Sequence, residues 1–174
     1  MIVDFKGITP QIDPSAWIAH SALVLGDVCI GAQSSVWYNS VVRGDVNRIR
    51  IGARSNIQDL SMVHVTRDLA DLCIGDEVTI GHRVIVHGCK IGDRVMVGMG
   101  AVILDNAQIE SDVIIGAGSL VLQGQQIPAG VLAVGHPAKV VRELTERDLQ
   151  WLRLSAAHYV ETSAEHAEIA LPKS

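Results

Sequence analysis

The chain has 174 residues, a length typical of one domain, and its net charge of −5 argues against nucleic acid as its main partner. Its composition is 48% hydrophobic but only 3% aromatic, so the core is expected to consist of aliphatic side chains. The three cysteines show no CxxC spacing, which argues against a disulfide framework or a zinc ribbon. No apolar run approaches the ~18 residues of a membrane span, and Met1–Ile12 lacks a signal-peptide pattern. We therefore expect a cytoplasmic protein with no membrane partner.

Most of the chain follows a six-residue repeat. An aliphatic residue, often followed by Gly, recurs every six positions, with a small or β-branched residue four positions on, as in Ile30-Gly31-Ala32-Gln33-Ser34. This period predicts a parallel β-helix, in which three hexads form one triangular coil and coils stack about 4.8 Å apart. A β-sandwich would instead show strands every 8–12 residues or so and hairpin turns such as Asn-Gly, which are absent. The inward positions are Ile18, Val24, Ile30, Val36, Val42, Ile51, Ile57, Val63, Ile74, Ile80, Val86, Ile91, Val97, Ile103, Ile109, Ile115, Val121 and Ile127.

The repeat slips in three places. Three extra residues follow Val42, five extra follow Val63, and one residue is missing after Val86. Insertions in a solenoid go to the outside, often on the binding face, so we expect loops around Val46–Arg50 and Thr66–Leu72. Each slip comes just after a polar residue of one set: Arg43, His64 or His87.

A different pattern follows Ile127, where the repeat ends. Thr145 is suited to cap a helix, with Asp148 three residues on as a variant of the capping box. Apolar residues then recur at helical spacing, at Leu149, Leu152, Ala156 and Val160. We predict an all-β domain over residues 1–140. The C-terminal segment, 141–174, should hold a helix over Thr145–His166 packed along the β-helix, and a frayed tail over Ala167–Ser174.

The hexad period assigns a direction to two histidines. His64 follows the inward Val63 and His87 follows the inward Val86, at the same face of consecutive coils. Side chains alternate along a strand, so both histidines should point outward, stacked roughly 5 Å apart at the backbone. Arg43 belongs to the same column one coil earlier.

A third histidine, His82, lies elsewhere. It follows Ile80 by two residues, on the preceding face near a corner, in a column with Tyr38 and Asp59. Catalytic zinc sites use three protein ligands and keep a fourth position for water. His82 would more naturally reach a metal held by a neighbouring subunit, so three subunits with parallel axes would share three identical sites.

Two neighbouring surface histidines are also compatible with a solvated pair that binds no metal. The third histidine favours the metal site, as do the polar residues expected nearby, which are Arg43, Asp45, Gln58 and Asp59.

These residues carry a resemblance to a known family. Set in hexapeptide repeats, they resemble the γ-class carbonic anhydrases over nearly the whole chain, and the end of the repeat and the helix resemble the shorter bacterial and archaeal members. The matching stretches are Arg43-Gly44-Asp45, Asn56-Ile57-Gln58-Asp59, His64, Gly81-His82, His87-Gly88, Gly135-His136-Pro137-Ala138-Lys139 and His158-Tyr159.

The resemblance implies a left-handed β-helix, a homotrimer with zinc (or iron or cobalt) at its subunit interfaces, and reversible hydration of carbon dioxide to bicarbonate. It implies that Gln58 contacts the metal-bound water and that Arg43 pairs with Asp45 across the interface. Asp59 would lie beside them, and Tyr159 would reach the pocket from the helix. The implied metal ligands are His64, His82 and His87.

The chain departs from the prototype of that family in groups that would export a proton. Val46 stands where the prototype has a glutamate, and the acidic loop is reduced to Thr66–Leu72, with Asp68 and Asp71. Two other activities share parts of this pattern: a metal-dependent acyl-CoA thioesterase and a hexapeptide-repeat acyltransferase. A non-catalytic assembly or metal-carrying role is a further alternative.

Overall fold

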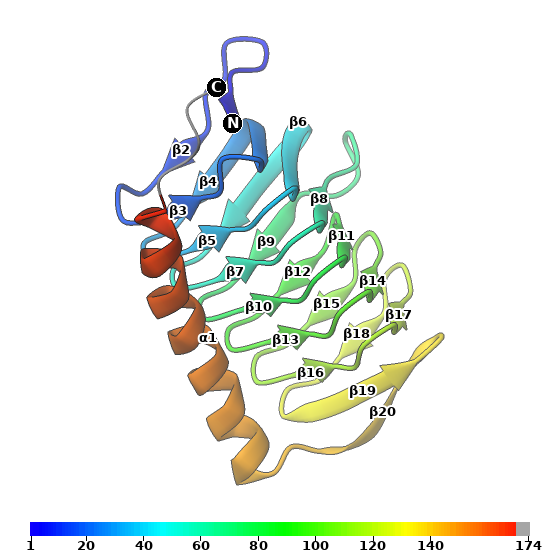
Figure 1. Cartoon of the computed structure of the whole chain (residues 1–174). Coiled ribbons are helices and arrows are strands. Elements are labelled where there is room, and N and C mark those ends of the chain that lie inside the picture. Colours follow the sequence, from blue (N-terminus) through cyan, green and yellow to red (C-terminus); the bar gives the residue numbers. More distant parts are fainter. Residues whose placement is uncertain (170–174) are drawn as a thin grey trace.

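The fold is a parallel β-helix of about seven turns with a single helix along its side, as seen in a computed structural model (Figure 1). The structure describes residues 1–169, so the end of the predicted tail, 170–174, lies outside the described residues. The predicted parallel β-helix with a C-terminal helix is confirmed. The three cysteines are free thiols. Within residues 1–169, no helix has the length and apolar character needed to cross a membrane.

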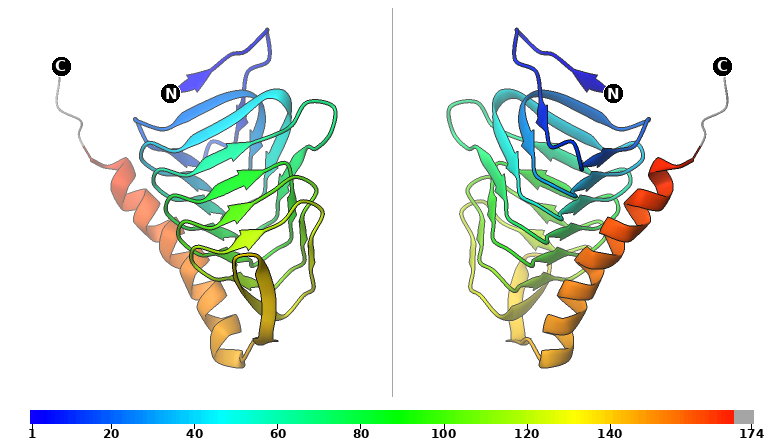
Figure 2. Two further views of the ribbon diagram at one scale, coloured as in Figure 1. Left: turned by 90° about the vertical axis from the view of Figure 1, so that its right-hand side faces the viewer. Right: turned by 90° about the vertical axis from the view of Figure 1, so that its left-hand side faces the viewer.

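Three faces make up the β-helix, and its coils are seen edge-on in Figure 2. The first two faces belong to one sheet, because β4 and β6 continue around the corner between them. The first face holds β1 (Ile2–Val3), the first halves of β4 (Leu23–Ile30) and β6 (Val41–Ile51), β8 (Met62–His64), β11 (Ile85–His87), β14 (Val102–Ile103) and β17 (Leu120–Val121). The second holds the remaining halves of β4 and β6 with β2 (Gln11–Ile12), β9 (Leu72–Ile74), β12 (Lys90–Ile91), β15 (Gln108–Ile109) and β18 (Gln126–Ile127).

The third face is a separate sheet that ends in an antiparallel hairpin. Its strands are β3 (Trp17–Ile18), β5 (Ser35–Val36), β7 (Asn56–Ile57), β10 (Thr79–Ile80), β13 (Met96–Val97), β16 (Ile114–Ile115), β19 (Val131–Gly135) and β20 (Ala138–Glu143).

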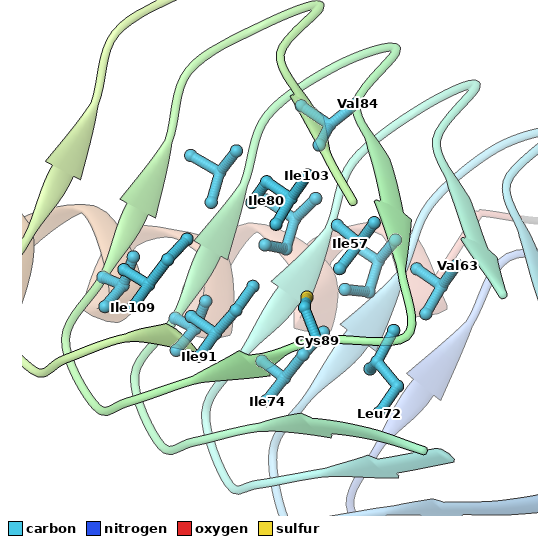
Figure 3. Close-up of a cluster of buried hydrophobic side chains, with 14 of the residues drawn as sticks. Ile57, Val63, Leu72, Ile74, Ile80, Val84, Cys89, Ile91, Ile103 and Ile109 are labelled. Carbon is cyan, nitrogen blue, oxygen red and sulfur yellow. The ribbon is translucent and has the colours of Figure 1, made fainter. Parts of the chain in front are cut away.

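The core consists of the aliphatic columns that the hexads predict. Val42, Val63 and Val86 pair in register on the first face, and all three are fully buried. Figure 3 shows such side chains stacked coil upon coil inside the triangle. Of the predicted inward positions, only Ile18 is half-buried, because it lies in the first coil at the open end. Stacked branched side chains fill such a core without large rings.

At one of the slips in the repeat, the structure differs from the predicted loop. Val46–Arg50 is not a loop but part of β6, where the extra residues oppose Asp27 as a bulge. The strand regains register at Ile49 because this side chain is fully buried in the core. The second insertion does form a turn, closed by a bridge between Thr66 and Ala70, but it ends before the buried Leu72.

Helix α1 (Glu146–Ala167) packs along the β-helix, as predicted, and the face it covers is the third. Thr145 is its N-cap and forms the full capping box with Asp148. Hydrogen bonds from Arg142 and then from Thr145 hold the pKa of the Asp148 carboxyl well below its usual value. Leu152 and Ala156 of the predicted stripe are buried against the sheet.

We predict that Thr145→Ala lowers the free energy of unfolding by about 1 kcal/mol, the usual value of an N-cap hydroxyl. Thr145→Ser keeps the hydroxyl and should behave like the wild type. Denaturant unfolding of both variants measures the difference, and equal stability of the two would show that the cap contributes nothing here.

Candidate metal centre

His64 and His87 stack at the ends of β8 and β11, as the hexad period predicts. They are register partners, and the Nδ1 of His64 lies 3.0 Å from the Nε2 of His87. Both side chains are partly buried, with 16% and 29% exposed. Arg43 is the register partner of His64 one coil earlier, which confirms the predicted column.

Each of these two rings is held by a carboxylate through its other nitrogen. The Nε2 of His64 is 2.9 Å from Asp45 Oδ1, and the Nδ1 of His87 is 2.8 Å from Asp105 Oδ1. Carboxylates accept hydrogen bonds, so the nitrogen that faces the carboxylate carries the proton. In the neutral rings, His64 Nδ1 and His87 Nε2 then both present lone pairs to each other. The two lone pairs repel each other, and a cation between them, either a proton or a metal ion, removes this repulsion.

Asp45 is held in turn by Arg43, whose Nη1 donates to Asp45 Oδ2. Burial raises the pKa of the Asp45 carboxyl, but the hydrogen bonds from His64 and Arg43 and the positive charge of Arg43 outweigh burial and lower this pKa overall. The resemblance implied that Arg43 and Asp45 pair across a subunit interface. In this structure the two residues already pair within one chain, because they lie two apart on the same strand, β6, and pairing across an interface stays a prediction.

His82 lies apart from the pair, beside the third face. It follows β10, and its Nδ1 is 3.0 Å from Asp59 Oδ2. Its side chain is 42% exposed. Among the described residues, no three His, Cys, Asp or Glu side chains of one chain are gathered as a metal site. The structure therefore brings two of the three predicted ligands together and leaves the third on another surface.

The geometry of the pair fits a zinc ion. Two nitrogens at 2.0–2.1 Å from a tetrahedral zinc are roughly 3.3 Å apart, close to the 3.0 Å between the facing nitrogens. A carboxylate on the other ring nitrogen is also the usual partner of a metal-bound histidine. The donor set accordingly suits zinc, or another metal that accepts imidazole.

A pocket of about 390 Å³ lies beside His82, between α1 and the third face. Gln58 and Tyr159 line it, together with apolar residues such as Met96 and Ile114. Gln58 is almost fully buried, and its Nε2 donates to Asn56 Oδ1 at 3.0 Å. Because the amide nitrogen is the donor in this bond, the amide oxygen of Gln58 is the atom available to accept one.

Tyr159 contacts the pocket from α1, as the resemblance implied. Burial raises the pKa of the Tyr159 hydroxyl, and the negative charge of Asp59 raises it further. The Tyr159 hydroxyl is therefore protonated at neutral pH and is able to donate a hydrogen bond. Its ring packs edge-on against Trp37, with centroids 5.4 Å apart, which fixes its position.

The residues that differ from the family prototype gather on one surface. Val46, Asp68 and Asp71 line a second, polar pocket of about 630 Å³ that also includes Asp45. Val46 is partly buried and packs against the core. Asp71 is paired with Arg48 at 2.9 Å.

Sequence reasoning missed Asp105. It belongs to the coil after His87, and the hexad rule alone does not direct it toward that ring. The missing residue after Val86 shortens the corner at Gly88, and Asp105 lies directly against this glycine. The one-residue deletion was the available signal.

The comparisons with known proteins agree with the fold and with the resemblance seen in the sequence. Residues 71–105 and 88–123 match the family described as bacterial transferase hexapeptide (six repeats). A carbonic anhydrase of Geobacillus kaustophilus is 52% identical over 92% of this chain and 88% of its own length. Protein YrdA of Escherichia coli is 45% identical over 94% of this chain and 92% of its own length. Mitochondrial γ carbonic anhydrase 2 of Arabidopsis thaliana is 43% identical over 91% of this chain, which spans 59% of the plant protein.

Solved structures share the fold. A hexapeptide transferase family protein from Anaplasma phagocytophilum has a TM-score of 0.91 and 41% sequence identity, over 95% of this chain and 97% of the other. The chain belongs to the hexapeptide-repeat family of γ-class carbonic anhydrases.

Proposed function

We propose that the protein is a zinc-dependent carbonic anhydrase that interconverts carbon dioxide and bicarbonate as a homotrimer. We also propose that it acts in the cytoplasm, where reducing conditions suit its three free thiols. Iron or cobalt would suit the same donors.

One observation carries this proposal: all three candidate ligands have the same arrangement. His64, His82 and His87 each have one ring nitrogen within 3.0 Å of an aspartate, which leaves the other nitrogen for a metal. Histidines that only face solvent have no need for three such carboxylates. The pattern is that of metal ligands held in one tautomer and orientation.

The third ligand would come from a neighbouring copy. An apolar column on the first face runs two residues before the column of Arg43, His64 and His87, and Ile85 in it is 42% exposed. Burying such a surface against another copy would bring a partner's third face toward the histidine pair. The column consists of Val41, Met62, Ile85, Val102 and Leu120.

A bound zinc ion would supply a water of lowered pKa for the attack on carbon dioxide. The residues of the chain would orient the reactants around it. The amide oxygen of Gln58 would accept a hydrogen bond and so align the attacking water. Tyr159, protonated and at the pocket wall, would donate to a bicarbonate oxygen.

Proton export is the step that this chain is least equipped for. Val46 has no proton to carry, and Asp71 is already paired with Arg48. Buffer molecules would then have to remove the proton released in each turnover.

We predict that His64→Ala, His82→Ala and His87→Ala each lose most of the bound metal, because each removes one of three nitrogen ligands. His136→Ala, at an exposed turn, should retain it. Metal analysis of the purified variants measures this. A variant of the first three with full metal content would remove that histidine from the ligand set.

We predict that Ile85→Lys prevents trimer formation and lowers metal content, because a charge would be buried in the interface. Val141→Lys is the matched control, since Val141 is exposed on β20, away from the histidines. Sedimentation velocity with metal analysis of each fraction tests both variants. A metal-loaded monomer in the wild type would contradict the shared site.

We predict that carbon dioxide hydration by the wild type is weak or depends on buffer, and that Val46→Glu raises turnover at low buffer. Proton-transfer groups typically contribute about 10²–10⁴-fold. Val46→Gln introduces a side chain of the same shape as glutamate but without a carboxylate, so it should not raise turnover. Because Val46 packs on the core, the thermal stability of both variants is measured alongside.

Fast, buffer-independent hydration by the wild type would show that another group exports the proton. A preparation that binds metal, hydrolyses acyl-CoA and fails to hydrate carbon dioxide would replace this proposal with the thioesterase.

A further inference from the structure

We propose that Asp105, supported by Thr66, is the positioning residue that fixes His87 as a metal ligand. The inference rests on the proposed function, since it concerns the same site. It also assigns a role to the inserted turn after His64, because Thr66 is the first residue of that turn and would support Asp105.

Asp105 contacts His87 and Thr66 at the same time. Its Oδ1 is 2.8 Å from His87 Nδ1, and Thr66 Oγ1 donates to the carboxylate at 3.1 Å from Oδ1 and 3.0 Å from Oδ2. The Asp105 side chain is only 19% exposed. His87 and Thr66 both donate hydrogen bonds, so the Asp105 carboxylate acts as an acceptor for each.

The backbone around Asp105 leaves it little freedom. The chain at Gly88 has a φ of +47°, and a Cβ there would lie 2.1 Å from Asp105 Oδ1 and 2.7 Å from the Cβ of Ala70. Asn106 N donates to Gly88 O at 2.7 Å, and Gly124 N donates to Asp105 O at 2.9 Å. The carboxylate is therefore held over Gly88, between the histidine and the inserted turn.

The two carboxylates of the site differ in charge compensation. Asp45 is paired with the cation Arg43, whereas Asp105 has the neutral Thr66 as its second partner. More of the negative charge of Asp105 is thus available to the His87 ring. A proton held on Nδ1 directs the lone pair of Nε2 toward the facing nitrogen of His64, where the metal would lie.

The test is the zinc affinity of Asp105→Ala, measured by competition with a chelator. We expect affinity about 10–100-fold weaker than that of the wild type, the usual effect of removing such a partner. Thr66→Val, nearly isosteric, should give a smaller loss. Asp93→Ala is the control, because Asp93 also accepts a bond from the neighbouring coil, but from the Asp76 backbone at 2.9 Å.

A second measurement separates positioning from a general loss of structure. In metal-free protein labelled with ¹⁵N-histidine, the hydrogen-bonded Nδ1–H of His87 should give a downfield proton signal. The signal should be present in the wild type and Asp93→Ala, and absent from Asp105→Ala.

Unchanged zinc affinity in Asp105→Ala would overturn the inference, as would a retained Nδ1–H signal. Neither result depends on turnover. If the wild type binds zinc but does not hydrate carbon dioxide, the proposed activity fails and the role of Asp105 is still tested by its own variant.

Discussion

The hydrogen-bond register between successive coils is the constraint on which the rest of this structure depends. It places equivalent residues of neighbouring coils directly above one another, about 4.8 Å apart. The same register stacks Val63 on Val86 inside and His64 on His87 outside. The Gly88 N–H that donates to His64 O at 2.9 Å continues it at the site itself. The packing of the core and the spacing of the two histidines therefore have a single cause.

The contacts of the candidate metal centre lie where this regularity is broken. The bulge in β6 puts Asp45 beside His64, and the turn after His64 puts Thr66 beside Asp105. The shortened corner at Gly88 lets that carboxylate reach His87. A solenoid supplies a rigid, repeated frame, and a few local departures bring unlike side chains together on it.

One chain holds two of the three candidate ligands, and this has a thermodynamic consequence. In the proposed trimer, metal binds only the assembled form, so metal and assembly stabilise each other. The apolar column that contains Ile85 and the histidine column lie side by side on the first face. Contacts that bury the one would bring a partner's His82 toward the other.

The sequence by itself determined the β-helix, its inward columns, the helix cap at Thr145 and the stacking of His64 on His87. Each of these follows from a period or a local motif, because the register of a repeat converts residue number into direction. Only the tertiary structure decided what happens at the slips. Val46–Arg50 forms part of a strand because Ile49 is buried in the core. Asp105 contacts His87 because the corner at Gly88 is one residue shorter. The six-residue repeat does not predict such contacts, because the residues involved do not occupy equivalent positions of it. Only the folded chain brings them together.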